Sequence, residues 1–263
     1  MRFETLIVDR RDHISWLTLN RPESLNAMNR VLVRELRAFF SQLGDDRETR
    51  LVVLRGAGRA FCAGLDLKEG GDGDDSVQAA LRGQRTISEL VIMMRRAPQP
   101  IIACVHGAAC GGGFALALGA DVRLAGESAR MNAAFIRIGL SACDVGVSYF
   151  LPRMVGASVA AELLLTGNFI ESSRAERLGL VSRVVPDAEL ETAAQSLADE
   201  MLRNSPLGLR LTKECLNASL DAGSLEQVIA MEDRNQILCT RSEDFREGIT
   251  AFLQKRPAQY SER

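Results

Sequence analysis

Three consecutive glycines, Gly111 to Gly113, come shortly after an apolar run at 101–105 and lead into a second apolar run at 114–118. This spacing predicts a buried strand, a turn, and a helix that opens at the glycines. The first N–H groups of a helix have no internal acceptor and lie at the positive end of the helix dipole. They can therefore stabilise an anion or a developing oxyanion, and the Gly112 N–H is the expected donor.

Other uses of these glycines are tested by their spacing. The sequence GAACGGG matches neither the GxxxxGK[ST] phosphate loop nor the GxGxxG dinucleotide fingerprint, so nucleotide binding is disfavoured. Close packing of the helix on its neighbours remains an alternative reason for the glycines.

A second turn rich in small residues lies at 56–68, with the sequence GAGRAFCAGLDLK. A strand ending near residue 54 would enter this turn, and Ala63 and Gly64 would let the backbone approach a ligand closely. If the loop curls as Gly64 permits, the Leu65 N–H becomes a second donor. Many strand-to-helix loops look similar, so this segment alone also fits a plain turn.

The elements that must position these turns alternate along the first half of the chain. Strands are predicted at 5–8, 14–19, 51–54, 101–105 and 122–125, and helices at 29–43 and 76–97. After about residue 145 the patterns become helical, at 157–166, 187–203, 206–221, 225–239 and 244–255, with one short strand near 181–185. This order predicts an α/β fold with a helical carboxy-terminal third.

The amino-acid composition argues against some classes of protein, such as nucleic-acid binders and membrane proteins. The chain has 263 residues, 46% hydrophobic and 25% charged, which suits one large globular core. Thirty-two basic and thirty-four acidic residues are mixed along the chain, and this argues against a nucleic-acid binder. No apolar run is long enough for a membrane span or a signal peptide, so we expect a cytoplasmic protein.

The spacing of the cysteine, histidine and acidic residues does not indicate a metal site or a redox site. Six scattered cysteines and two histidines lack zinc-ligand spacing. The acidic segment 70–75 (GGDGDD) fails the EF-hand pattern and is interpreted as a mobile surface loop. We expect no metal and no cofactor.

Four blocks of sequence together resemble the enoyl-CoA hydratase/isomerase (crotonase) superfamily, in order and over nearly the whole chain. They are FCAGLDLKE, VHGAACGGGFALALGADVRLAG, LPRMVGASVAAELLLTGNFIESSRAERLGLVSRVV and SEDFREGITAFLQKRP. The resemblance implies a spiral of ββα units, at 1–200, which carries the acyl-CoA site. It also implies a helical region, at 201–263, that forms homotrimers or hexamers.

The resemblance also implies roles for particular residues. Matched motif to motif, the backbone oxyanion donors fall on Leu65 and Gly112, which agrees with the backbone argument above. An acyl-CoA thioester would be the substrate, with coenzyme A part of it and not a separate cofactor. Its contacts carry over to Glu23, Ser24, Leu25, Ala63, Asp66, Leu67 and Phe135, and to Phe252 and Lys255 of the terminal helix, which would reach a neighbouring subunit's site.

The pattern departs from a typical hydratase at both catalytic glutamates. The matching positions hold Ala115 and Phe135, and neither side chain can transfer a proton. Hydration by two carboxylates therefore cannot run in its usual form. Double-bond isomerisation, decarboxylation, thioester hydrolysis and acyl-CoA binding without turnover all stay open.

Asp144 is the best candidate for an acid/base group, because its segment is similar to one where some isomerases of this family carry a functional aspartate. Its apolar neighbours, which would desolvate the carboxyl group, are Ile138, Leu140, Val145, Val147 and Phe150. Asp144 could equally cap a helix beginning near Val147, with Gly146 easing the turn. His106 is expected to be structural, and Ser148 lacks the GxSxG context of a hydrolase nucleophile.

Overall fold

The computed structural model of the chain describes residues 3–69 and 76–261. The segment 70–75, interpreted above as a surface loop, lies outside the described residues. The strands are β1 (Leu6–Arg11), β2 (Ile14–Leu19), β3 (Leu51–Gly56), β4 (Ile101–Val105), β5 (Ala108–Cys110), β6 (Val122–Gly126), β7 (Arg130–Asn132), β8 (Ile170–Glu171) and β9 (Arg183–Val185). The helices are α1 (Arg30–Gln42), α2 (Val77–Arg96), α3 (Gly112–Gly119), α4 (Val147–Val155), α5 (Ala157–Thr166), α6 (Ser172–Arg177), α7 (Leu190–Leu202), α8 (Pro206–Ser219), α9 (Leu225–Thr240) and α10 (Glu243–Gln254).

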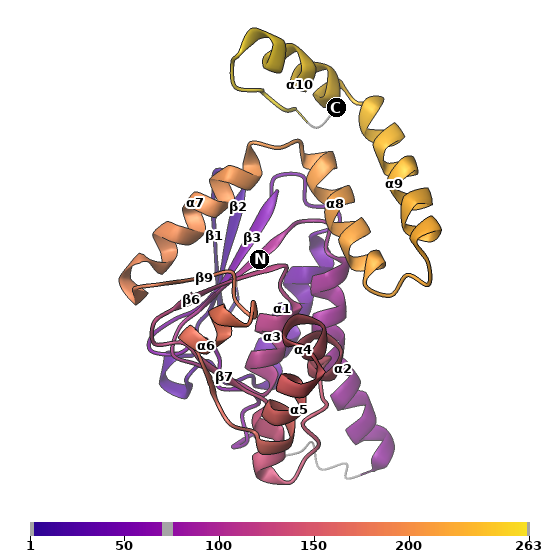
Figure 1. Cartoon of the computed structure of the whole chain (residues 1–263). Coiled ribbons are helices and arrows are strands. Elements are labelled where there is room, and N and C mark those ends of the chain that lie inside the picture. The colour runs from indigo at the N-terminus through magenta and orange to yellow at the C-terminus, as the bar shows by residue number, and fades with distance from the viewer. Residues whose placement is uncertain (1–2, 70–75, 262–263) are drawn as a thin grey trace.

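The larger sheet has six strands in the order β1-β2-β3-β4-β6-β9. Only the β1–β2 hairpin is antiparallel, and the other neighbours run parallel. The central strands β2 and β4 are buried along their whole length, and β3 is buried over its first four residues, because both faces of a parallel sheet are covered. Helix α7 covers one face, and α1, α2 and α3 lie on the other (Figure 1).

The alternation of side chains along each strand divides the core between these two faces. On the α7 side, Trp16, Val53 and Cys104 pack against Leu190 and Ala194. The larger cluster on the other side holds the alternate strand residues and the apolar faces of α1 to α3. The carboxyl ends of β3 and β4 lead into the two glycine turns, so this sheet is the platform that positions both of them.

A second, smaller sheet lies next to the glycine turns. Its strands β5, β7 and β8 have two or three residues each, with β5 parallel to β7 and β7 antiparallel to β8. β5 leads directly into Gly111 and α3, all eight residues of which are buried. A fully buried helix explains why this segment is apolar on every side.

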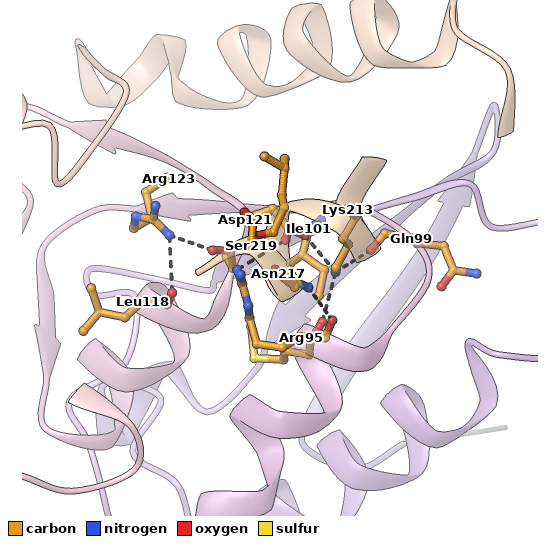
Figure 2. A network of polar contacts seen from close by, with 12 residues as sticks. Arg95, Gln99, Ile101, Leu118, Asp121, Arg123, Lys213, Asn217 and Ser219 are labelled. Carbon is orange, nitrogen blue, oxygen red and sulfur yellow. Dashed lines mark hydrogen bonds and ion pairs between the residues drawn. The ribbon is translucent and has the colours of Figure 1, made fainter. Parts of the chain in front are cut away.

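A buried polar network fixes α8 to the platform (Figure 2). The Lys213 Nζ lies 2.8 Å from Asp121 Oδ2 and donates to the carbonyls of Met94 and Gln99 at 3.0 and 2.9 Å. Asp121 also accepts the Ile101 N–H at 2.8 Å, at the start of β4. All three ammonium protons of a lysine that is 5% exposed thus have partners, as burial of a charge requires.

Beyond α8 the chain leaves the core. α9 and α10 extend away from the sheet at the end of the molecule opposite α5 (Figure 1). The predicted apolar stripe of the last helix, Phe245, Ile249 and Phe252, is 43, 49 and 81% exposed. It therefore does not pack on the core of its own chain.

Candidate active site

The two glycine turns lie side by side because the first turn forms hydrogen bonds with β5. The Cys62 N–H donates to the Ala108 carbonyl at 3.1 Å, and the Cys110 N–H donates to the Cys62 carbonyl at 3.0 Å. A Cβ atom added at Gly64, whose φ is +101°, would lie 2.9 Å from the Cys110 oxygen and 3.7 Å from the Gly112 nitrogen. Only glycine allows this approach, as the small residues at 63–64 predicted.

The amides of Leu65 and Gly112 differ from those around them. Nearby, the N–H groups of Ala63, Asp66 and Gly111 each donate to a backbone carbonyl. Within residues 3–69 and 76–261, neither the Leu65 N–H nor the Gly112 N–H donates to any group. Two donors without acceptors, contributed by adjacent turns, are the requirement for binding an oxyanion.

Helix α3 adds its dipole at one of these two donors. Gly111 is the N-cap and has no side chain to satisfy the first amides, and the Gly112 N–H is at the first helical position. At the other end, the buried Arg123 guanidinium donates to the Ala120 carbonyl at 2.6 Å. Burial lowers the pKa of Arg123 to about 10, so the guanidinium stays charged and complements the negative end of the helix.

A third segment, residues 21–28, closes against the first turn. The Ala63 N–H donates to the Leu25 carbonyl at 3.0 Å, and the Met28 N–H donates to the Gly64 carbonyl at 2.7 Å. The predicted coenzyme A contacts Glu23, Ser24 and Leu25 therefore lie beside Ala63, Asp66 and Leu67. Leu67 is 72% exposed, so a ligand can reach it.

Two residues that sequence reasoning missed hold this segment in place. The Arg21 guanidinium lies 3.0 Å from Asp66, and this hydrogen bond holds the pKa of the Asp66 carboxyl below its usual value. The fully buried Asn26 side chain donates to the carbonyls of Ala57 and Ala60, both at 2.8 Å. Asn26 has a φ of +56°, a conformation in which asparagine is enriched. The signal available in the sequence was therefore the asparagine itself, as a residue typical of turns.

The two positions that the resemblance matches to the glutamates of a hydratase are buried and apolar. Ala115 is 0% exposed in α3, and Phe135 is 5% exposed in the 3-10 turn Ala134–Ile138. A Cβ atom at Gly111 would lie 3.4 Å from the Phe135 ring, so this ring flanks the glycine turn. Phe135 thus places an apolar ring beside Gly111.

Asp144 lies in the turn before α4, and its surroundings differ from the expected ones in two respects. Ile138 and Leu140 are 54 and 52% exposed, so they do not bury the carboxyl group as expected. The capping alternative is also wrong, because the N-cap of α4 is Gly146 and no side chain caps this helix. The Asp144 Oδ1 instead accepts the Val145 N–H at 2.7 Å and the Gln84 amide at 2.5 Å.

Phe252 and Lys255 lie far from these turns. Figure 1 places α10 at the opposite end of the molecule from α5 and well away from α3. Phe252 is exposed, and Lys255 ends the helix in the left-handed conformation. One chain does not bring these two residues to its own glycine turns.

The environments of His106 and Cys62 favour structural roles over catalytic ones. The His106 Nε2 lies 2.9 Å from the Gly58 carbonyl oxygen, in line with the structural role expected for it. Burial raises the pKa of the Cys62 thiol to about 12, which keeps it protonated. No group of three or more metal-ligating side chains is gathered anywhere in the described ranges.

Among the helices described, none is long and apolar enough to cross a membrane.

Known proteins resemble this chain over nearly its full length, and their names agree on one family. The chain is 40% identical over 263 residues to a probable enoyl-CoA hydratase, echA12, of Mycobacterium bovis, covering 98% of this chain and 92% of the relative. It is 38% identical over 248 residues to the 1,2-epoxyphenylacetyl-CoA isomerase of Escherichia coli, covering 93% and 94%. The crystal structure of an enoyl-CoA hydratase from Bacillus anthracis matches with a TM-score of 0.93 at 32% identity, covering 99% of this chain and all of that one.

The fold and the family follow from these matches. The structural neighbours confirm the predicted α/β fold of the crotonase type. The sequence profile described as enoyl-CoA hydratase/isomerase matches residues 9–263. The chain belongs to the enoyl-CoA hydratase/isomerase family.

Proposed function

We propose that this chain isomerises an acyl-CoA thioester through an enolate, using one carboxyl group in place of the two glutamates of a hydratase. The Leu65 and Gly112 N–H groups hold the enolate oxygen, and Asp144 moves the proton between carbon atoms of the acyl group. The observation that carries the proposal is the pair of adjacent main-chain amides without acceptors, next to two apolar residues where carboxylates would be needed for hydration.

Energetics support this use of the two amides. Removing a proton next to a thioester carbonyl places negative charge on the carbonyl oxygen, and preorganised donors stabilise that charge. In comparable oxyanion holes each donor contributes about 3 to 4 kcal/mol to the transition state. At Gly112 the positive end of the α3 dipole adds to the effect.

The choice of isomerisation over hydration rests on the acid/base inventory. Addition of water needs one group to activate the water and another to protonate the α-carbon, and Ala115 and Phe135 provide neither. Moving a double bond needs only one group that takes a proton at one carbon and returns it at another. The relative named 1,2-epoxyphenylacetyl-CoA isomerase, 38% identical, supports isomerisation of a CoA thioester as the class of reaction, since its own named substrate is an epoxide.

Binding of the rest of the substrate follows from the same arrangement. Coenzyme A would lie along Glu23, Ser24 and Leu25 on one side and Ala63, Asp66 and Leu67 on the other. Phe252 and Lys255 would meet it from a neighbouring copy, since α10 extends away from its own core. Copies would therefore form a trimer, or a hexamer of two trimers, working in the cytoplasm without a metal or redox cofactor.

The experiment compares two substrates on the purified protein, crotonyl-CoA for hydration and trans-3-hexenoyl-CoA for isomerisation. We expect turnover of the 3-enoyl thioester and little or no hydration. Asp144→Asn should lower kcat at least about 100-fold, the usual contribution of a positioned acid/base, with KM changed little. Asp199→Asn on α7 is the control.

Two results would contradict the proposal. Efficient hydration of crotonyl-CoA would show that another group replaces the glutamates. Unchanged isomerisation in Asp144→Asn would remove Asp144 from the mechanism.

The loss of both glutamates also favours a second candidate, a protein that binds acyl-CoA without turnover. Calorimetry with hexanoyl-CoA and a panel of thioesters distinguishes the two. Tight binding without any product, from hydration, isomerisation, decarboxylation or thioester hydrolysis, would support the binding protein over every enzyme.

A further inference from the structure

The Asp144 carboxylate is held at one oxygen only. Oδ1 accepts two hydrogen bonds, from the Val145 N–H at 2.7 Å and from the Gln84 Nε2 at 2.5 Å. Across the described residues, Oδ2 receives no hydrogen bond and no ion pair. One oxygen is thus fixed by the protein, and the other keeps its lone pairs for an exchangeable proton.

The backbone around Asp144 is also fixed. Val145 has a φ of +46° although it is β-branched, and its side chain is 4% exposed. A β-branched residue in this region is strained, and the surrounding packing must compensate for the strain. Gly146, with a φ of +82°, and the Val147 N–H, which donates to the Asp144 carbonyl at 2.9 Å, complete a tight turn into α4.

Gln84 comes from a different element, sixty residues earlier in the chain. It lies in the first half of α2, and the second half of this helix is anchored by the buried Leu90, Val91 and Met94. The backbone turn sets where the Asp144 Cα lies, but it does not stop the carboxylate from rotating about its last side-chain bond. A second donor on Oδ1, from a helix held independently, restricts that rotation.

We infer that Gln84 is a positioning residue for Asp144: its amide binds Oδ1 and so directs Oδ2 toward the acyl group. This inference rests on the proposed function, in which Asp144 moves the proton. Small misplacements of a reacting group lower the rate strongly while leaving substrate binding intact.

The test is Gln84→Met, which keeps the length of the side chain and removes the donor. On trans-3-hexenoyl-CoA we expect kcat to fall about tenfold, the effect of losing one hydrogen bond to a charged group, with KM within twofold. In an Asp144→Asn background the same substitution should have no further effect on kcat. A crystal structure of Gln84→Met should show the Asp144 carboxylate rotated away from its present position.

The matched control is Gln195→Met. Gln195 donates to Asp199 at 2.7 Å on α7, across the sheet, so this variant breaks a glutamine–aspartate pair remote from the glycine turns. Its kcat should equal that of the unaltered protein. Melting temperatures of both variants separate a loss of rate from a loss of folding.

The outcomes distinguish this inference from the proposed function. If Asp144→Asn is inactive but Gln84→Met keeps full kcat, the positioning role is overturned and the proposed function stands. If Gln84→Met leaves the carboxylate where it is in the crystal structure, the positioning role is overturned whatever the activity. If Asp144→Asn stays active, the proposed function fails and so does this role for Gln84.

Discussion

Neighbouring glycines at the start of α3 are required for different reasons. A Cβ atom at Gly113 would lie 2.1 Å from the Cys62 carbonyl oxygen, which belongs to the backbone and cannot move aside. A Cβ atom at Gly112 would meet only the terminal methyl group of Met28, at 2.3 Å. Gly113 therefore allows the two turns to pack together, and Gly112 faces a flexible side chain that can be shortened.

This difference lets the Gly112 N–H be tested without a steric artefact. In a Met28→Ala background, Gly112→Ala and Gly112→Pro both add a Cβ atom, but only proline removes the donor. Proline is accepted at the first position of a helix. We expect kcat of the proline variant to be about 100- to 1000-fold below that of the alanine variant, as for other oxyanion donors.

Melting temperature and the circular dichroism spectrum of both variants serve as the folding check. Equal kcat in the alanine and proline variants would show that the Gly112 N–H does not stabilise the reaction.

Polar groups join helix α8 to the platform. Lys213 and Asn217 donate to carbonyls at the carboxyl end of α2, and Lys213 also pairs with Asp121 (Figure 2). Burial lowers the pKa of Lys213, and Asp121 opposes that shift. Since a buried charge without its partner is costly, this network specifies where α8 lies.

We predict that Lys213→Met lowers the free energy of unfolding by about 3 kcal/mol, because it removes the ammonium donor from the Met94 and Gln99 carbonyls and the ion-pair partner from Asp121. Urea denaturation measures the change, and Lys68→Met, at an exposed position, is the control. A loss below about 0.5 kcal/mol, the size typical of surface substitutions, would show that the network does not anchor α8.

For the whole molecule, the carboxy-terminal helices expose more apolar surface than one chain can cover. The exposed residues include Leu216, Leu225, Ile237, Phe252 and Leu253. Apolar patches of this kind mark protein–protein contacts. Together with the resemblance, they support assembly through α8 to α10.

Accordingly, Phe252→Glu combined with Leu253→Glu should dissociate the assembly, since it places two charges in an apolar contact. Size-exclusion chromatography with light scattering should show the mass of a single chain in place of three or six. Ile7→Glu on the edge strand β1 should leave the mass unchanged. An unaltered protein that already runs as a single chain would contradict the expected trimer.

Local patterns predicted most of the regular structure because each element carries its own signal. The strands at 14–19 and 101–105 were predicted to the residue, and the helix at 29–43 is α1 with its two flanking residues. Asn29 caps it through the Leu32 N–H, as its residue type predicts. The strands β5, β7 and β8 were missed because two or three residues show no periodicity, and only contact between distant segments forms them.

In the candidate site, too, some features were predicted from local sequence and others depend on the tertiary structure. Close approach of two backbones favours glycine, so the sequence alone predicted the two turns and named the Leu65 and Gly112 amides as a hypothesis, and the resemblance added the missing glutamate pair. The adjacency of Gly64 and Gly112, the Arg21–Asp66 contact and the bond from Gln84 to Asp144 join residues 45 to 60 positions apart. Such pairings leave no local pattern, because only the packing of complete elements against one another decides them.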